Sequence, residues 1–153
     1  MKNKFLLIIC NLALVNTGFA QWQPANNGLT GKWINVLTVD PTTNNIYAGT
    51  DKGVYLSTDD GRTWVRKNED FLVKDFEVST IATSGNNIFA GTGGAGIFLS
   101  TNNGSTWTPV NNGLSGKDIR VTEIAISENN IFIGIINSGV WKRKLSESII
   151  GIN

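Results

Sequence analysis

Histidine is absent from this sequence, and cysteine, proline and charged residues are scarce. Without histidine, no imidazole can bind a metal, serve a Ser–His–Asp triad or pair with a catalytic thiol. Charged residues make up 16% of the 153 residues, with 13 basic against 12 acidic side chains. This balance provides no basic surface, so we expect no nucleic-acid partner. The 41% hydrophobic content is enough for one packed domain.

The first twenty residues have the pattern of an export signal. Lys2 and Lys4 precede an apolar run over residues 5–15, and small residues at 18 and 20 suit a signal peptidase. The run is shorter than the ~20 residues of a bilayer-spanning helix, which argues against the alternative of a retained anchor. We therefore predict a signal peptide over residues 1–20 and no membrane span after its removal. The protein would be exported to the periplasm, the medium or the cell surface.

Removal of the signal peptide would also remove Cys10, the only cysteine. The mature chain would then have neither a disulfide nor a thiolate ligand. Its carboxylate-rich turns at 40–41 and 59–61 lack the spacing of a calcium loop. The glycine-rich segment 91–96 joins two expected strands and precedes no helix, so we predict a flexible hairpin there and no phosphate loop. We expect no metal site and no cofactor.

The sequence repeats itself with a period near 43 residues. The motif Asn-Asn-Ile-aromatic begins at residues 44, 86 and 129, and a Gly-aliphatic-aromatic motif begins at 53, 96 and 139. An eight-residue box at 57–64 returns at 100–107. The first unit reads as four short strands, at 34–39, 46–50, 54–57 and 63–66, separated by Pro, Asn, Asp and Gly turn residues. Stacked four-stranded antiparallel units of this length predict an all-β fold of β-propeller blades.

The repeat also predicts the domain organisation. β-Propeller repeats span 21–145, with blades at about 33–66, 75–109 and 118–144, and a C-terminal tail covers 146–153. Trp22 lies 42 residues before Trp64, so a strand near residue 22 would match the fourth strand of a preceding blade. The third unit stops after three strands. An N-terminal fourth strand and a C-terminal set of three are how propellers close their ring.

About three blades are too few to close a ring, because propellers have about 4–8. Two hypotheses follow. In one, two chains form a homodimer with a six-bladed ring, each N-terminal strand completing the partner's last blade. In the other, the chain is a piece of a longer propeller whose exposed blade faces favour association.

The eight-residue box has the pattern Ser, any, Asp/Asn, any, Gly, any, Thr, Trp. Ser and Asp/Asn side chains can bond nearby backbone N–H groups, the glycine can adopt a positive φ, and the tryptophan can bury its ring. The pattern resembles the Asp-box, or bacterial neuraminidase repeat, found between the third and fourth strands of propeller blades. The residues that carry the resemblance are Ser57, Asp59, Gly61, Thr63 and Trp64 in the first copy, and Ser100, Asn102, Gly104, Thr106 and Trp107 in the second.

Among Asp-box families, the chain most resembles propellers related to the photosystem II stability/assembly factor. It also resembles repeat propellers of secreted and cell-surface bacterial proteins, and sialidases and sortilin-type receptors share the box. In all of these families the box is peripheral and structural, which implies a structural role for both boxes here.

A sialidase-type protein that binds or hydrolyses glycans is the alternative function. The resemblance to sialidases would imply three arginines that hold a carboxylate, a Tyr–Glu nucleophile pair and an acidic Asp. The four arginines are Arg62, Arg66, Arg120 and Arg143, and only Arg120 is not accounted for by its place in the repeat. Tyr47 and Tyr55 occupy repeat positions that are aromatic elsewhere, which predicts core residues. We therefore assign no catalytic residue and expect no enzyme.

The function that we favour is an exported, non-catalytic scaffold that holds a protein or a glycan at one face of the propeller. The candidate binding residues precede or open the first strands of the first and third units: Lys32, Trp33, Lys117, Asp118 and Arg120. The sequence identifies no particular partner.

Overall fold

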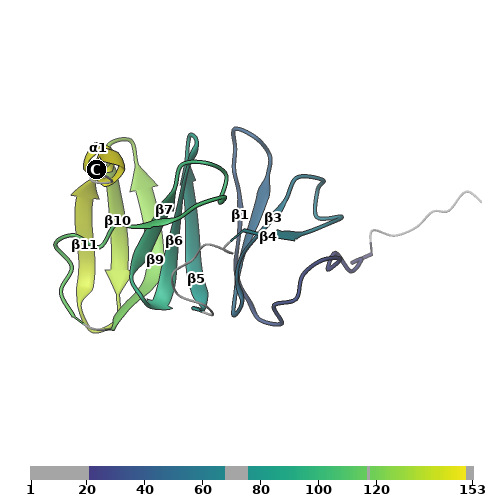
Figure 1. The fold of residues 1–153 in the computed structure, drawn as a ribbon, viewed down its shortest axis with the longest axis horizontal. Coiled ribbons are helices and arrows are strands. Elements are labelled where there is room, and N and C mark those ends of the chain that lie inside the picture. Colours follow the sequence, from purple (N-terminus) through teal and green to yellow (C-terminus); the bar gives the residue numbers. More distant parts are fainter. Residues whose placement is uncertain (1–20, 68–75, 117, 151–153) are drawn as a thin grey trace, which may run out of the picture.

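The structure, a computed structural model, describes residues 21–67, 76–116 and 118–150. The predicted signal peptide, the predicted start of the second blade at residue 75, and Lys117 lie outside these residues. The described part of the chain folds into antiparallel strands followed by one short helix (Figure 1). No helix in this part is long and apolar enough to cross a membrane.

The first blade is a four-stranded antiparallel sheet with the strands in sequence order. It consists of β1 (Ile34–Val39), β2 (Ile46–Thr50), β3 (Gly53–Ser57) and β4 (Val65–Arg66). The prediction of four strands is confirmed, but β4 begins two residues later than predicted. The backbone N–H of Thr63 is bound by Asp59 and that of Trp64 by Asn27 O, so neither is available to pair with β3.

The second blade repeats this arrangement with β5 (Val78–Ser84), β6 (Asn87–Gly94), β7 (Ile97–Ser100) and β8 (Thr108–Pro109). Residues 91–96 join β6 to β7 in a hairpin, as predicted, but most of the segment is strand. β6 continues through Gly94, and Gly93 and Gly94 pair with the next blade. A Cβ at Gly91 would lie 2.7 Å from Val121 Cγ1, so the glycines permit close approach of that blade.

The third blade has three strands, β9 (Ile119–Ser127), β10 (Asn130–Ile135) and β11 (Gly139–Lys144). The helix α1 (Leu145–Ile150) follows directly, so the predicted tail at 146–153 begins inside a helix. The predicted strand near residue 22 is not formed, and Trp22 is fully exposed. A strand needs a partner, and the edge of β11 lies at the opposite end of the molecule from the N-terminal segment (Figure 1).

The blades stack through their first strands, β1, β5 and β9, in the register of the repeat. Asn35 Nδ2 donates to Val78 O (3.0 Å), and Thr38 Oγ1 donates to Ile81 O (2.9 Å). Ser79 Oγ donates to Val121 O in the same way between the second and third blades. Each pair is separated by 42 or 43 residues, so one contact pattern recurs at both blade interfaces.

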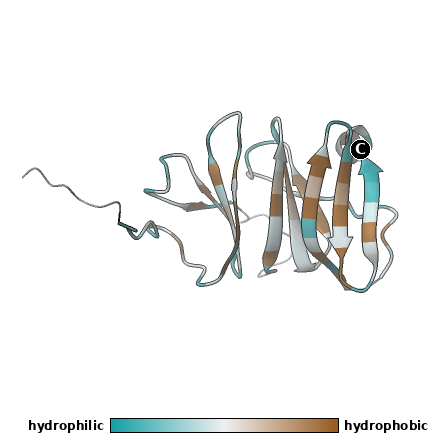
Figure 2. Ribbon diagram, turned by 180° about the vertical axis from the view of Figure 1, so that it is seen from behind, coloured by the Kyte–Doolittle hydropathy of each residue, from teal (hydrophilic) through white to brown (hydrophobic). Residues whose placement is uncertain are grey.

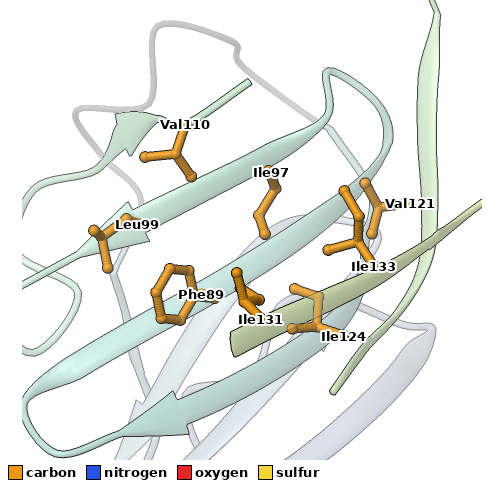
Figure 3. Close-up of a cluster of buried hydrophobic side chains, with 8 residues drawn as sticks. All are labelled: Phe89, Ile97, Leu99, Val110, Val121, Ile124, Ile131 and Ile133. Atoms are coloured by element: carbon orange, nitrogen blue, oxygen red, sulfur yellow. The ribbon is translucent and has the colours of Figure 1, made fainter. Parts of the chain in front are cut away.

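The hydrophobic core lies between the blades, because successive strand residues face opposite sides of each sheet. Figure 2 shows the apolar residues concentrated on the strands. The cluster between blades 1 and 2 contains Tyr47, Val54, Leu56, Val78, Ile81, Ile88 and Ala90. The cluster between blades 2 and 3, drawn in Figure 3, contains Phe89, Ile97, Leu99, Val110, Val121, Ile124, Ile131 and Ile133. Tyr47 and Tyr55 are both buried, as predicted for core residues.

Candidate functional site

The first box forms a closed network of hydrogen bonds at the corner between β3 and β4. Ser57 Oγ donates to Asp59 Oδ1 (2.9 Å) and accepts from the Gly61 backbone N–H (2.9 Å). The Asp59 carboxylate also accepts from the Thr63 backbone N–H (2.8 Å) and the Thr63 hydroxyl (2.6 Å). Gly61 has a φ of 79°, a left-handed conformation that favours glycine. The predicted turn bonds and the predicted positive φ are therefore present.

The second box has the same geometry with an amide in place of the carboxylate. Asn102 Oδ1 accepts from the Ser100 hydroxyl (3.0 Å) and from the Thr106 backbone N–H (2.9 Å). Asn102 Nδ2 donates to Thr106 Oγ1 (2.8 Å), while the Gly104 backbone N–H donates to Ser100 Oγ (2.9 Å). A hydroxyl can donate or accept, so it bonds either a carboxylate or an amide N–H.

Each box ends in a tryptophan that binds the segment preceding its blade. Trp64 Nε1 donates to Ala25 O (2.9 Å), and Trp107 Nε1 donates to Lys67 O (2.7 Å). Ala25 and Lys67 are 42 residues apart, so the same contact recurs one repeat later. Trp64 is buried, and Trp107 packs against the cluster between blades 1 and 2. Both tryptophans thus tie a blade corner to the chain that enters the blade.

The charge of Asp59 is stabilised by the folded state. Hydrogen bonds from the Thr63 hydroxyl and backbone N–H hold the pKa of Asp59 below its ordinary value. A lowered pKa in the folded state stabilises the fold above the unfolded pKa of about 3.9. This contribution is lost as the pH falls through the folded-state value.

Asp59→Asn converts the first box to the chemistry of the second. We expect the variant to fold, with a melting temperature slightly below that of the wild type at pH 7, because Asn102 makes the equivalent bonds. The difference should shrink as the pH is lowered through the folded-state pKa, which thermal unfolding at a series of pH values would measure. Asn102→Asp is the reciprocal control and should introduce a pH-dependent gain in melting temperature. A difference that does not vary with pH would contradict this account of Asp59.

The predicted binding residues of the first blade lie just before β1. The Asp51 carboxylate oxygen Oδ1 accepts from the backbone N–H groups of Lys32 (3.0 Å) and Trp33 (3.3 Å), and Asp51 N donates back to Trp33 O (3.2 Å). These three bonds hold the backbone at residues 32–33, whereas the Trp33 side chain is 72% exposed. This combination places a large aromatic ring in solvent on a fixed backbone.

The predicted binding residues of the third blade lie at the start of β9. Arg120 Nε donates to Asp118 Oδ2 (2.9 Å), and both side chains are more than half exposed. Ile136 N, from the turn between β10 and β11, donates to Arg120 O (3.0 Å). An exposed ion pair of this kind stabilises a fold very little.

The two groups share one edge of the blade stack without touching. Because β1, β5 and β9 stack in the same direction, the residues that precede β1 and β9 lie at the same end of these strands. The second blade separates the two groups. We call the residues Lys32, Trp33, Asp118 and Arg120 the edge surface.

A groove of about 510 Å³ lies between the outer strands of blades 2 and 3. Its polar lining includes Arg143, which donates to Val110 O (Nη1, 3.4 Å) and to Glu147 O (Nη2, 2.6 Å). We call it the blade 2–3 groove. Its apolar lining residues are Ile97, Val110, Leu114, Ile131, Ile133 and Trp141.

Sequence reasoning missed Asp51 and the groove for different reasons. The sequence identifies Asp51 as a turn residue, and nothing local signals that its carboxylate holds the chain before β1. The sequence does carry a signal for the groove. Arg143 lies 43 residues after Ser100, the first residue of the second box. The third unit therefore has an arginine in place of the box serine, and this arginine lines the groove.

No protein-family model matches the sequence, and no curated protein is significantly similar to it. Solved structures do match the fold. An ancestral GH74 enzyme has a TM-score of 0.63 at 21% identity, over 76% of this chain and 18% of that one. YCF48 bound to D1 peptide has a TM-score of 0.61 at 17% identity, over 77% of this chain and 38% of that one.

A third structure is PorZ, an essential bacterial surface component of the type-IX secretion system of Porphyromonas gingivalis. Its TM-score is 0.62 at 20% identity, over 76% of this chain and 18% of that one. All three are β-propeller proteins, and the chain spans 18–38% of their lengths. The fold and these likenesses define the class: an all-β protein made of β-propeller blades.

Proposed function

We propose that this chain is an exported, non-catalytic β-propeller repeat protein that holds a protein or a glycan at its edge surface. The observation that carries the proposal is Trp33, an exposed indole on a backbone held by Asp51. Rigid aromatic side chains dominate binding energies because they bury a large area and lose little conformational entropy. Lys32 and the Asp118–Arg120 pair would supply the polar rim of such a site.

The placement of the arginines supports a non-catalytic role over the sialidase-type alternative. Arg120 is the second residue of β9, and Arg143 lies near the end of β11, which runs parallel to β9. The two arginines are therefore at opposite ends of the third blade. Arg62 and Arg66 belong to the outer corner of the first blade. A site that holds one carboxylate with three arginines needs them to converge. GH74 enzymes share the fold, so hydrolysis remains the alternative outcome of the experiment.

Export implies a partner outside the cytoplasm, and the surface of the producing cell is the first place to test. We expect the labelled chain to bind those cells saturably, and Trp33→Ala to weaken binding about tenfold or more. Val65→Ala, which alters an exposed apolar residue on the outer strand β4, is the matched control and should bind as the wild type does. Protease or periodate treatment of the cells would distinguish a protein from a glycan partner.

Two results would overturn parts of the proposal. Equal binding by Trp33→Ala and the wild type would remove the edge surface as the binding site. Release of free sugar from sialosides or cell-surface glycans by the purified chain would contradict a non-catalytic role and favour the sialidase-type alternative.

A further inference from the structure

The N-terminal segment of the described chain is a second copy of the fourth strand and connecting segment of blade 2. Residues 22–29 and 107–114 share the pattern Trp-x-Pro-x-Asn-Asn-Gly-Leu, beginning at Trp22 and Trp107. The second halves also fold alike. Leu29 N donates to Asn26 O (3.0 Å) and Leu114 N to Asn111 O (2.9 Å), and Gly28 and Gly113 have φ values of 90° and 88°.

The first halves of the two segments differ. Thr108 and Pro109 form β8, which pairs with Leu99 and Phe98 of β7. Residues 21–26 form no strand and Trp22 is fully exposed, although Ala25 O accepts the indole N–H of Trp64. The described chain thus carries the sequence of a fourth strand, with its box-type tryptophan, but has no third strand beside it to pair with.

The third blade has the opposite deficiency. β11 pairs with β10 and forms an edge of its sheet in the described chain. In the other two blades a box and a fourth strand follow the third strand, whereas here α1 follows β11. Position 150, one period after Trp107, is an isoleucine within α1.

The blade 2–3 groove has the features of the place that a box tryptophan fills elsewhere. Trp107 donates to Lys67 O while Lys67 N donates to Val54 O (2.8 Å). One period later, Val110 N donates to Ile97 O (3.0 Å), so Val110 O is the acceptor equivalent to Lys67 O. Val110 and Ile97 line the groove, and Val110 O accepts a long bond (3.4 Å) from Arg143 in place of the shorter indole bond.

We propose that the blade 2–3 groove and the edge of β11 receive the N-terminal segment of a second copy of this chain. Trp22 of the second copy enters the groove and donates its indole N–H to Val110 O. By the register of β7 and β8, Gln23 and Pro24 pair with Lys142 and Trp141. The chain's own N-terminal segment is bound to blade 1, at the other end of the stack (Figure 1).

Two such contacts close a symmetric dimer, because each copy offers one N-terminal strand and one incomplete third blade. Blade 1 of each copy would then stack on blade 3 of the other and cover the exposed side chain of Val140. The dimer proposal is argued from contacts that recur in the repeat, and it is independent of what the edge surface binds.

Light scattering of the purified chain over a range of concentrations tests the dimer. We expect twice the mass of one chain, and a rise in the dimer dissociation constant of about tenfold or more in Trp22→Ala. Gln21→Ala is the control, since neighbouring side chains of a strand point to opposite faces. A monomer at every concentration, a different oligomer, or equal dimerisation of Trp22→Ala and the wild type would overturn the proposal.

A cross-link tests the register. Chains carrying Gln23→Cys and chains carrying Lys142→Cys, both with Cys10→Ser, are mixed under oxidising conditions, so the mixed disulfide can form only between copies. Directly opposed strand residues lie about 4.5–5.5 Å apart, within disulfide reach. We expect efficient cross-linking of this pair and little of the shifted pair Gln21→Cys with Lys142→Cys. Equal cross-linking of both pairs would contradict the proposed register.

Discussion

Phe89→Ala is expected to lower the free energy of unfolding by about 3–5 kcal/mol. Phe89 is fully buried in the cluster between blades 2 and 3 (Figure 3). Truncation removes the ring's contacts with side chains from both blades and leaves a cavity that the rigid sheets cannot close. Denaturation in urea, followed by tryptophan fluorescence, would measure the loss.

Phe132→Ala is the matched control, because Phe132 occupies the same repeat position 43 residues later. It lies on the third blade and is only partly buried. Both substitutions would be compared in the Trp22→Ala background, so that association of chains does not cover Phe132. The loss for Phe132→Ala should be less than half of that for Phe89→Ala. Equal losses would contradict the assignment of the Phe89 face to a blade interface.

Gly91→Ala is expected to destabilise the fold by about 1–3 kcal/mol through overpacking. A Cβ at Gly91 would lie 2.7 Å from Thr80 Cγ2 and 2.7 Å from Val121 Cγ1, on first strands of two successive blades. Either the blades separate or the side chains leave their preferred rotamers. Thermal or urea unfolding would detect the loss.

Gly93→Ala is the control for this prediction. Gly93 is in the same strand, two residues along, and the nearest neighbour to a Cβ added there is Glu77 at 3.7 Å. We expect a change within about 0.5 kcal/mol. Equal tolerance of Gly91→Ala and Gly93→Ala would contradict the close packing of β5 and β9 against Gly91.

The parts of the fold that were predictable from sequence are those that local chemistry determines. The strands of the first blade end at turns of Asp, Asn and Gly, and the repeat transfers that assignment to the next two blades. The bonds of the box are also local, since Ser57, Asp59 and Thr63 lie within a few residues of one another. These bonds form in one corner whatever surrounds it.

The parts that sequence did not predict depend on contacts between distant segments. The glycine-rich composition suggests a flexible hairpin over residues 91–96, yet residues 91–94 form strand. Gly91 and Thr92 pair with β5, and Gly93 and Gly94 pair with β9. The strand near Trp22 reads as a strand from its repeat position, but its partner strand is not in reach within one chain. For the candidate site, the sequence identified Trp33, while Asp51, which holds its backbone, was visible only in the structure.

Successive blades stack on one another with their first strands in the register of the repeat, and nuclear Overhauser effects from two glycines test this arrangement most directly. A Cβ added at Gly49 would lie 2.8 Å from Val78 Cγ1, and one added at Gly91 would lie 2.7 Å from Val121 Cγ1, so both glycines face the next blade at close range. We predict cross-peaks between the Gly49 Hα and the Val78 methyl and between the Gly91 Hα and the Val121 methyl. Cross-peaks from these glycines to methyls of their own blades alone would contradict the stacking.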